Sequence, residues 1–305
     1  MGVLGLIGLM VVTVGINAWP SFSANGLSWF GNSGNVVLQF RAMHAGMALP
    51  GHSLLYFSAW PLIWGTILVT VVAVALALVF STLAAIFLTE FAPGPVRRVL
   101  EPVVRLLAGV PSVVYGLIGI LAVARVVEEN FISNARKQSV AYVVQLNGKD
   151  LMTAALILTV MIMPIMVALT SSALASVPAS WREGSAALGV NRWRTIWRVS
   201  LRTARPAIAA ATVLATARAL GEAIMLAMVS GGRPFAANPL DGLTFLFEPV
   251  QPLAATIVQE FGGQTSGPVA STIYAIAMVL LVSAAFLSFA AWAVKQPLKR
   301  YGIGV

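Results

Sequence analysis

Long runs of apolar residues with very few charges most restrict how this chain can fold. A helix needs about 20 mainly apolar residues to cross the hydrocarbon core of a membrane. Six runs approach or exceed this length: Gly2–Ala18, Ile63–Leu88, Leu106–Ala124, Leu151–Ala175, Pro206–Val229 and Val269–Val294. The sequence therefore predicts an all-α integral membrane protein with six transmembrane helices.

The composition supports a surface that faces lipid. Of the 305 residues, 59% are hydrophobic and 10% are charged, whereas soluble domains carry about 25% charged residues. The net charge of +9 would suggest nucleic acid in a soluble protein, but here the basic residues lie between apolar runs. We therefore expect membrane lipid, and no nucleic acid, as a partner.

Metal and thiol chemistry find little support in the sequence. The chain has no cysteine, which excludes disulfides and thiolate ligands. The only histidines, His44 and His52, have no acidic residue near them in the sequence. Two isolated histidines make a poor metal site, so we expect no metal and no cofactor in this chain.

Basic residues in the connections predict the orientation in the membrane. Residues 90–105, 176–205 and the tail from Lys295 together hold twelve basic and three acidic residues, whereas the other three connections hold six of each. Because cytoplasmic connections carry an excess of Lys and Arg, we expect the first set, and both termini, to lie in the cytoplasm. Arg105, at the cytoplasmic end of the third run, is interpreted as a topology anchor.

The connection between the fourth and fifth runs contains a short helix. Ser180 and Glu183 have the spacing of a capping box, and Gly189 is a suitable C-terminal stop. These signals predict a helix over Trp181–Leu188. The residues in its middle are small and would let it lie close to another surface: Gly184, Ser185, Ala186 and Ala187. We interpret it as a docking helix.

Two charges lie inside the fifth run. Arg218 and Glu222 are four residues apart, so they share one face of a continuous helix. A charge at mid-bilayer costs about 2.5–3.5 kcal/mol on insertion scales, and such residues normally face the bundle interior or an aqueous path. The pair is either a structural ion pair or a substrate site. In the second interpretation, which we favour, Arg218 offers two N–H donors to an oxyanion, and Glu222 holds it in place.

The third run contains residues that interrupt helices. Gly109 and Pro111 can break or kink a helix and free backbone groups toward a cavity. The hydroxyls of Ser112 and Tyr115 follow directly and could donate to an oxyanion in a substrate path. Helix packing is the alternative role for these two residues, because small residues and prolines are common where membrane helices meet.

The loop around Glu183 resembles the EAA loop of binding-protein-dependent ABC importer permeases. Glu183-Gly184-Ser185, followed after three residues by Gly189, carries the resemblance. Gly184 stands where the family has its first alanine, and Arg202 stands where the family has a proline. In that family the loop bears a coupling helix that docks on an ATPase subunit.

The resemblance implies a type I ABC importer permease architecture, with a cytoplasmic coupling helix in an EAA-type loop at residues 176–205. The positions that it assigns to ATPase coupling are Glu183, Gly184, Ser185, Ala186, Ala187 and Gly189. It also implies two parts of the chain. Residues 1–59 would hold the first transmembrane helix and an external loop, and residues 60–305 the permease core.

Several stretches resemble the phosphate-importer permeases, and more closely their C type. They are residues 107–116, 218–222, 238–240 and 252–257. The resemblance begins at about Pro61. It implies a permease of an ATP-driven phosphate importer that works by alternating access in the bacterial plasma membrane. Its implied partners are a second permease of the A type, two ATPase subunits and an external phosphate-binding protein.

The chain itself is expected to be a transport subunit and not an enzyme. It has no GxxxxGK[ST] loop, so ATP and Mg would bind to the partner ATPases. One alternative is a permease for another oxyanion, such as sulfate or molybdate. A second alternative is an anion channel or secondary transporter outside the ABC class, which would leave the docking helix without a role.

Overall fold

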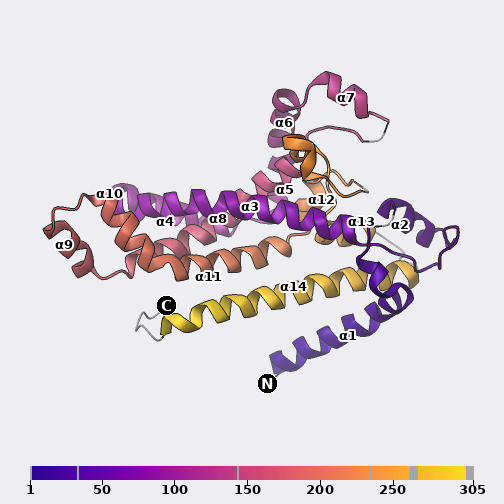
Figure 1. The fold of residues 1–305 in the computed structure, drawn as a ribbon, viewed down its shortest axis with the longest axis horizontal. Helices are drawn as coiled ribbons and strands as arrows, with labels where there is room; N and C mark the ends of the chain where they lie inside the picture. The colour runs from indigo at the N-terminus through magenta and orange to yellow at the C-terminus, as the bar shows by residue number, and fades with distance from the viewer. Residues whose placement is uncertain (1, 33, 143, 234, 262–266, 300–305) are drawn as a thin grey trace. The chain divides into compact units, whose positions relative to one another are not determined.

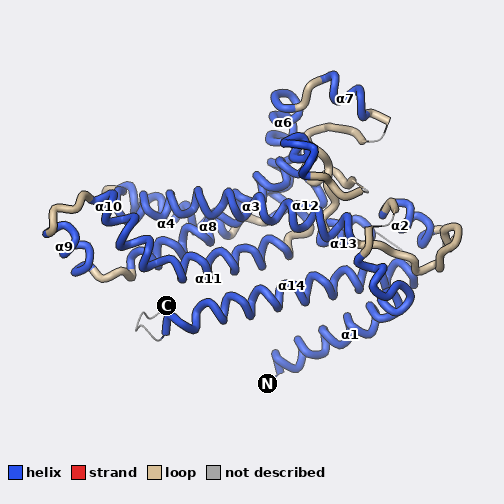
Figure 2. Tube along the Cα trace, in the orientation of Figure 1, coloured by secondary structure: helices blue, strands red, loops and turns tan. Residues whose placement is uncertain are grey.

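A computed structural model shows that the chain is built from helices (Figure 1). It describes all residues except 1, 33, 143, 234, 262–266 and 300–305. Within this part there are helices and loops but no β-strand (Figure 2), and a single isolated bridge pairs Gly231 with Val250. The prediction of an all-α protein is confirmed.

Four helices in the described part are long and apolar enough to cross a membrane. They are α1 (Gly2–Asn25) with its extension η1 (Gly26–Phe30), α3 (Trp60–Ile86) with η2 (Phe87–Phe91), α8 (Leu151–Ala175) and α14 (Gly267–Lys299). They correspond to the first, second, fourth and sixth apolar runs, so those four predictions of spanning helices agree with the structure.

The third expected span is interrupted. Helix α4 (Gly94–Ala108) ends just before Gly109, and α5 (Ser112–Ile118) begins just after Pro111. The chain continues through η3 (Gly119–Val123) into α6 (Ala124–Phe131). Taken as one broken span, these helices bring the number of candidate spans to five among the described residues.

Helix α4 begins well before Leu106, the expected start of the third run. Residues 94–105 were assigned to a connection because they carry charges, yet they form most of α4. Arg97, Glu101 and Arg105 recur every four residues and therefore share one face of that helix. A search for uncharged runs does not detect an amphipathic helix of this kind.

The fifth expected span is also interrupted. Helix α11 (Leu201–Leu220) is followed by three residues that are not helical, and then by the short α12 (Ile224–Val229). Among the described helices, α11 is not one of those apolar and long enough to span. Its three arginines and the break explain this. Six spans therefore remain a prediction, while four, or up to five, have the required length and composition.

Shorter helices make up most of the connections. They are α2 (Val36–His44), α7 (Asn134–Val140), α9 (Ala179–Ala187), α10 (Arg192–Thr195) with η4 (Ile196–Ser200), η5 (Pro239–Phe247) and α13 (Leu253–Glu260).

The chain forms two compact units, each assembled from three segments. Unit 1 comprises residues 1–71, 112–157 and 220–283, and unit 2 comprises residues 72–111, 158–219 and 284–305. In unit 1, the buried aromatic residues of the N-terminal segment share a core with α13 and the start of α14. Its members include Trp29, Phe40, Phe57, Leu253, Val269 and Ile273.

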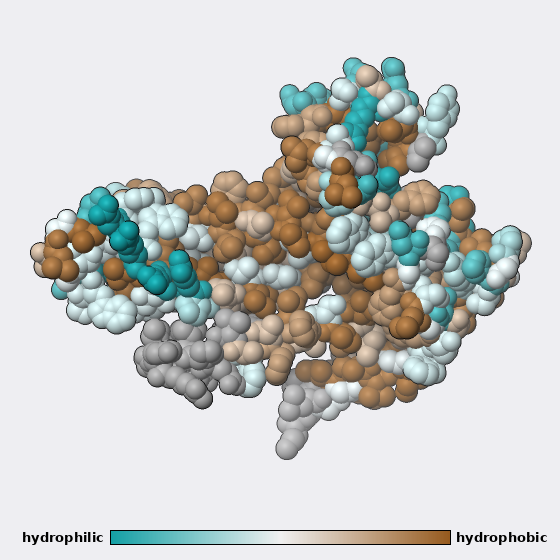
Figure 3. Space-filling model, in the orientation of Figure 1, coloured by the Kyte–Doolittle hydropathy of each residue, from teal (hydrophilic) through white to brown (hydrophobic). Residues whose placement is uncertain are grey.

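Unit 2 has an aliphatic core where α3, α8 and α11 meet. Ile86, Leu174, Ile196 and Ile208 are buried in it. Figure 3 shows hydrophobic side chains along the helices of this unit and hydrophilic ones around α9, α10 and the start of α11. This distribution suits helices that lie in lipid and a loop that reaches water.

Candidate functional site

The short helix expected between the fourth and fifth runs is α9, which lies at the tip of unit 2 (Figure 1). It begins two residues earlier than expected. Pro178, not Ser180, is the N-cap, and no side chain caps the helix start. Because a proline ring fixes φ near the helical value and has no N–H to satisfy, the helix starts directly after it. The expected capping box is therefore wrong.

The other end of α9 is closed by backbone hydrogen bonds around Gly189. Gly189 has φ +73°, a conformation that glycine adopts without a steric cost. Its N–H donates to the Ala186 carbonyl at 2.9 Å, and the N–H of Val190 donates to the Ser185 carbonyl at 3.2 Å. These two bonds form a Schellman motif, which stops the helix and turns the chain toward α10.

The face of α9 that carries the small residues is largely uncovered in the single chain. Glu183, Gly184, Ala186 and Ala187 are exposed, while Ser185 is half-buried. At the two ends of α9, Trp181 is 51% exposed and Leu188 is 84% exposed. Large apolar side chains that flank small residues on an exposed face suit the docking of another protein.

The loop that contains α9 is also bonded to a buried carboxylate, that of Glu90. Glu90, at the end of the helix that begins as α3, has a side chain only 7% exposed. It accepts a hydrogen bond from Arg182 of α9 at 3.1 Å and lies 3.9 Å from the Arg192 guanidinium. Arg182 also donates to the Val177 carbonyl at 3.1 Å.

Two further contacts involve α10, one with Phe91 beside Glu90 and one with α9. The Arg192 guanidinium lies 5.0 Å from the centre of the Phe91 ring, a cation–π arrangement. The hydroxyls of Ser185 and Thr195 share a hydrogen bond of 2.8 Å. Sequence reasoning used Glu90 only as the end of a span. Its acidic charge, directly after a long apolar run, was the signal that could have identified it.

Four positions were predicted to line a substrate path, and the structure places Ser112, Tyr115 and Glu222 in unit 1, on either side of the contact between α5 and α12. That contact depends on glycine. A Cβ on Gly116 would lie 2.6 Å from the Met228 sulfur, and a Cβ on Gly119, the first residue of η3, would lie 2.6 Å from Val229 Cγ1. The contacts advance in the same direction along both helices, so their N-terminal ends lie on the same side.

Ser112 and Glu222 lie at these N-terminal ends. Ser112 is the first residue of α5 and is half-buried, while Tyr115, one turn later, is 5% exposed. Glu222 comes just before α12 and is half-buried. Its Oε1 accepts the N–H of Met225 at 3.2 Å, which satisfies one of the free donors at the start of α12.

Arg218, the fourth position, lies in the last turn of α11 and its side chain is exposed. The expectation that Arg218 and Glu222 share one helix face is wrong, because α11 ends at Leu220. Gly221, a poor helix former, stands at this point. Among the residues that the structure describes, neither Arg218 nor Glu222 takes part in an ion pair.

A further buried acid lies at the start of α8. Asp150 is 1% exposed, and its Oδ1 accepts the N–H of Thr153 at 2.8 Å. Its second carboxylate oxygen, Oδ2, has no hydrogen-bond partner in the described structure. Burial raises the pKa of Asp150 to about 7, despite the hydrogen bonds from Thr153 that lower it.

Comparison with known proteins gives consistent results. The family model described as "Binding-protein-dependent transport system inner membrane component" matches residues 77–296. The chain is 36% identical to the "Probable ABC transporter permease protein YqgH" of Bacillus subtilis over 228 residues, which cover 74% of this chain and 68% of that protein. It is 31% identical to the "Phosphate transport system permease protein PstC 1" of Mycobacterium tuberculosis over 304 residues, which cover 95% and 88% of the two chains.

A solved structure supports the same fold. A chain of the MetNI methionine ABC transporter, in an inward facing conformation, superimposes with a TM-score of 0.56 at 19% sequence identity. The match covers 77% of this chain and 94% of that chain.

Proposed function

Because the chain belongs to the family of binding-protein-dependent transport system inner membrane components, we propose that it is the permease subunit of an ATP-driven phosphate importer. The observation that carries this proposal is the similarity to a phosphate transport system permease along 95% of the chain. The chain is a transporter subunit, and the energy comes from hydrolysis of ATP, which the partner subunits bind together with Mg.

The permease acts in a complex of several proteins. A second permease of the A type completes the path, two ATPase subunits drive it, and an external binding protein delivers phosphate. The exposed face of α9, with Trp181 and Leu188 at its two ends, supports an ATPase contact. The permease core begins near residue 60, and the N-terminal helix with its loop precedes it.

Helix α9 couples ATP hydrolysis to transport. Glu183, Gly184, Ser185, Ala186 and Ala187 dock on the ATPase, and Gly189 sets the end of the helix. The ion pairs of Glu90 with Arg182 and Arg192 support this role, because they link the loop to the end of a membrane helix. Movement of the docked ATPases is thereby transmitted to the helices, and the path opens alternately to the two sides.

The substrate path runs along the broken helices. Ser112 and Tyr115 offer neutral hydroxyl donors, and Arg218 offers the cationic one. Glu222 lies at the start of α12 beside this path, where its carboxylate accepts the N–H of Met225. The breaks at Gly109–Pro111 and after Leu220 support this assignment, because non-helical backbone at membrane depth is tolerated only beside protein or a water-filled cavity.

The chain lies in the bacterial plasma membrane with six spans. The α9 loop and both termini face the cytoplasm, which accounts for the excess of basic residues in the connections on that side. Helices α11 and α12 together form the span that is missing from the set of long apolar helices.

The experiment that tests the function is ATP-dependent phosphate uptake into proteoliposomes that hold the full complex, with excess sulfate as competitor. We expect uptake that sulfate does not reduce. Uptake blocked by sulfate would favour a permease for a different oxyanion, and a complex that forms without any ATPase subunit would contradict the ABC assignment.

The same uptake assay tests the role of Arg218 in the substrate path. Arg218→Gln is expected to abolish uptake while the complex still assembles, and Arg218→Lys, which keeps the charge but loses the bidentate geometry, is expected to retain part of it. Loss of assembly in both variants would instead assign Arg218 a structural role.

A further inference from the structure

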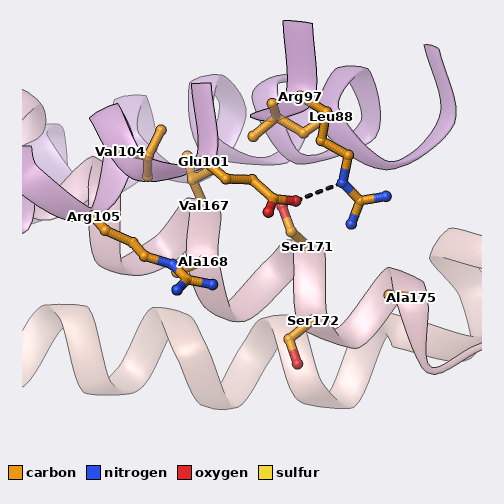
Figure 4. Close-up of a pocket in the computed structure, with 10 residues that line it drawn as sticks. All are labelled: Leu88, Arg97, Glu101, Val104, Arg105, Val167, Ala168, Ser171, Ser172 and Ala175. Carbon is orange, nitrogen blue, oxygen red and sulfur yellow. Dashed lines mark hydrogen bonds and ion pairs between the residues drawn. The ribbon is translucent and has the colours of Figure 1, made fainter. Parts of the chain in front are cut away.

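A cavity of about 230 Å³ lies in unit 2 between α4 and α8 (Figure 4). Its volume is below the range of roughly 300–1,000 Å³ that is usual for drug-sized ligands. It lies near the α9 end of the unit, because Leu88 and Ala175 border it, and these residues directly precede Glu90 and the α9 loop. The cavity thus suits a small solute close to the coupling region.

One wall of the cavity is the charged face of α4. Arg97, Glu101 and Arg105 all line it. Arg97 Nε and Glu101 Oε1 are 2.5 Å apart, so these two charges neutralise each other. Arg105 takes part in no ion pair among the residues that the structure describes. The wall therefore carries one uncompensated positive charge.

The other wall consists of small and hydroxyl-bearing residues of α8. Ala168, Ser171, Ser172 and Ala175 line it, and they recur at helical spacing on one face. The hydroxyl oxygen of Ser171 is inaccessible to solvent and has no hydrogen-bond partner in the described structure. The hydroxyls of Thr170, Ser200 and Ser230 are in the same state, so Ser171 donates to a group in the cavity only after its side chain has rotated toward it.

We propose that this cavity binds a phosphate-type oxyanion through the Arg105 guanidinium and the hydroxyls of Ser171 and Ser172. The ligand identity rests on the proposed function, which supplies inorganic phosphate on its way to the cytoplasm. Sequence reasoning assigned Arg105 to membrane topology alone. The structure places it in one cavity with Ser171 and Ser172.

These residues would bind an oxyanion weakly. A single guanidinium and neutral hydroxyls attract an oxyanion, while the nearby Glu101 carboxylate limits the affinity. A site on a transport path must bind its substrate strongly enough to admit it and weakly enough to release it. A lipid headgroup offers the same phosphate chemistry, so the experiment must separate the two sources.

The absence of cysteine from the chain permits a direct test. Ala168→Cys places a single thiol in the cavity wall and leaves the three proposed ligands in place. The full complex, with its other subunits free of reactive cysteine, is placed in discs of zwitterionic lipid and labelled with an uncharged, water-soluble maleimide, without ATP. We expect inorganic phosphate to slow labelling in a saturable manner, beyond the effect of KCl at equal ionic strength.

Variants of α4 identify the residue responsible. Added to Ala168→Cys, Arg105→Gln is expected to raise the half-protecting phosphate concentration about tenfold or more, as for the loss of one charge-assisted hydrogen bond. Arg105→Lys should retain part of the protection. Arg98→Gln is the matched control, because it removes a charge from the same helix without lining the cavity, and it should leave protection unchanged.

Each outcome has a clear meaning. Protection by phosphate in zwitterionic lipid assigns the site to the free ion, whereas protection that needs only anionic lipid assigns it to a headgroup. Protection by neither, or protection that Arg105→Gln does not weaken, overturns the proposal. The labelling does not depend on turnover, so a complex that takes up phosphate but shows no protection overturns the cavity site alone.

Discussion

At the scale of single residues, Glu90 determines the position of the loop between α8 and α11. Its carboxylate is nearly inaccessible and is shared by two arginines of that loop. Removing one member of a buried charge pair leaves the other without compensation and costs more than the pair itself contributes. Arg182 is 30% exposed, so water offsets part of this cost.

Glu90→Gln is expected to lower the stability of the complex by about 1–3 kcal/mol and to weaken the coupling of ATP hydrolysis to uptake. Thermal unfolding and the ratio of phosphate transported to ATP hydrolysed measure these effects. The control is Glu128→Gln, which breaks a more exposed pair with Lys137 and should cost less than about 1 kcal/mol. Equal effects of the two variants would contradict the role of Glu90.

Asp150 is expected to make stability depend on pH. Its pKa rises from 3.8 to about 7 in the folded protein, so the folded state binds more protons than the unfolded state in this interval. Stability is therefore highest below about pH 4 for this group and falls as the pH rises through 7. The loss approaches roughly 4 kcal/mol above pH 7, at about 1.4 kcal/mol for each pH unit.

Asp150→Asn keeps an acceptor for the Thr153 N–H and removes the ionisation. The variant should lose less stability than the native chain between pH 5 and pH 8, as measured by thermal unfolding of the purified complex at several pH values. An unchanged pH dependence would show that the Asp150 carboxyl does not titrate in this interval.

At the scale of elements, glycines at helix ends and at helix contacts restrict which side chains the chain can carry there. The backbone at Gly189 has a positive φ, and a Cβ there would meet nothing within 4 Å. The obstacle to substitution is thus conformational and not steric. At Gly119 the reverse holds, because its φ is ordinary but a Cβ would lie 2.6 Å from Val229 and 3.2 Å from Ile157.

Gly189→Ala is expected to cost about 1–2 kcal/mol at the end of α9, the usual penalty for a left-handed conformation. ATP hydrolysis should continue while uptake falls, because α9, the proposed coupling helix, loses its defined end. Gly189→Asn, which tolerates this conformation better, should restore part of the uptake. Full coupling in Gly189→Ala would argue against the docking role of α9.

Gly119→Ala is expected to separate η3, which continues α5, from α12 and to destabilise the chain by about 1–3 kcal/mol, as is usual for overpacking. Val229→Ala removes the methyl groups that the new Cβ would meet. The double variant should therefore be more stable than the sum of the single effects predicts, as a double-mutant cycle of unfolding free energies would show. Simple additivity would contradict the close contact.

The sequence predicted the elements that depend on apolar runs and missed those that depend on local chemistry. Helices α3, α8 and α14 follow from their hydrophobicity alone. Apolar runs do not predict α4, because the charges at Arg97 and Arg105 are equally typical of a loop. The end of α11 was missed because the charges of Arg218 and Glu222 suggested a continuous face, whereas Gly221 and the cap of α12 interrupt it.

At the scale of the whole molecule, the orientation in the membrane can be tested with single cysteines in the cysteine-free chain. Ser180→Cys places a thiol in the exposed first turn of α9, and Tyr142→Cys places one in the connection before α8, where the side chain is fully exposed. An impermeant maleimide should label the first only from the cytoplasmic side and the second only from outside. Labelling of both from one side would contradict the proposed orientation.

The division into two interleaved units has a consequence for the synthesis of the protein. Unit 1 needs residues 1–71, but also residues 220–283. During translation, the aromatic residues Trp29 and Phe57 therefore leave the ribosome long before Val269 and Ile273 exist to complete their core. The nascent chain must keep these groups from aggregating while most of its helices enter the bilayer. A chain that stops before α13 would contain an unfinished core and would be a natural substrate for membrane proteases.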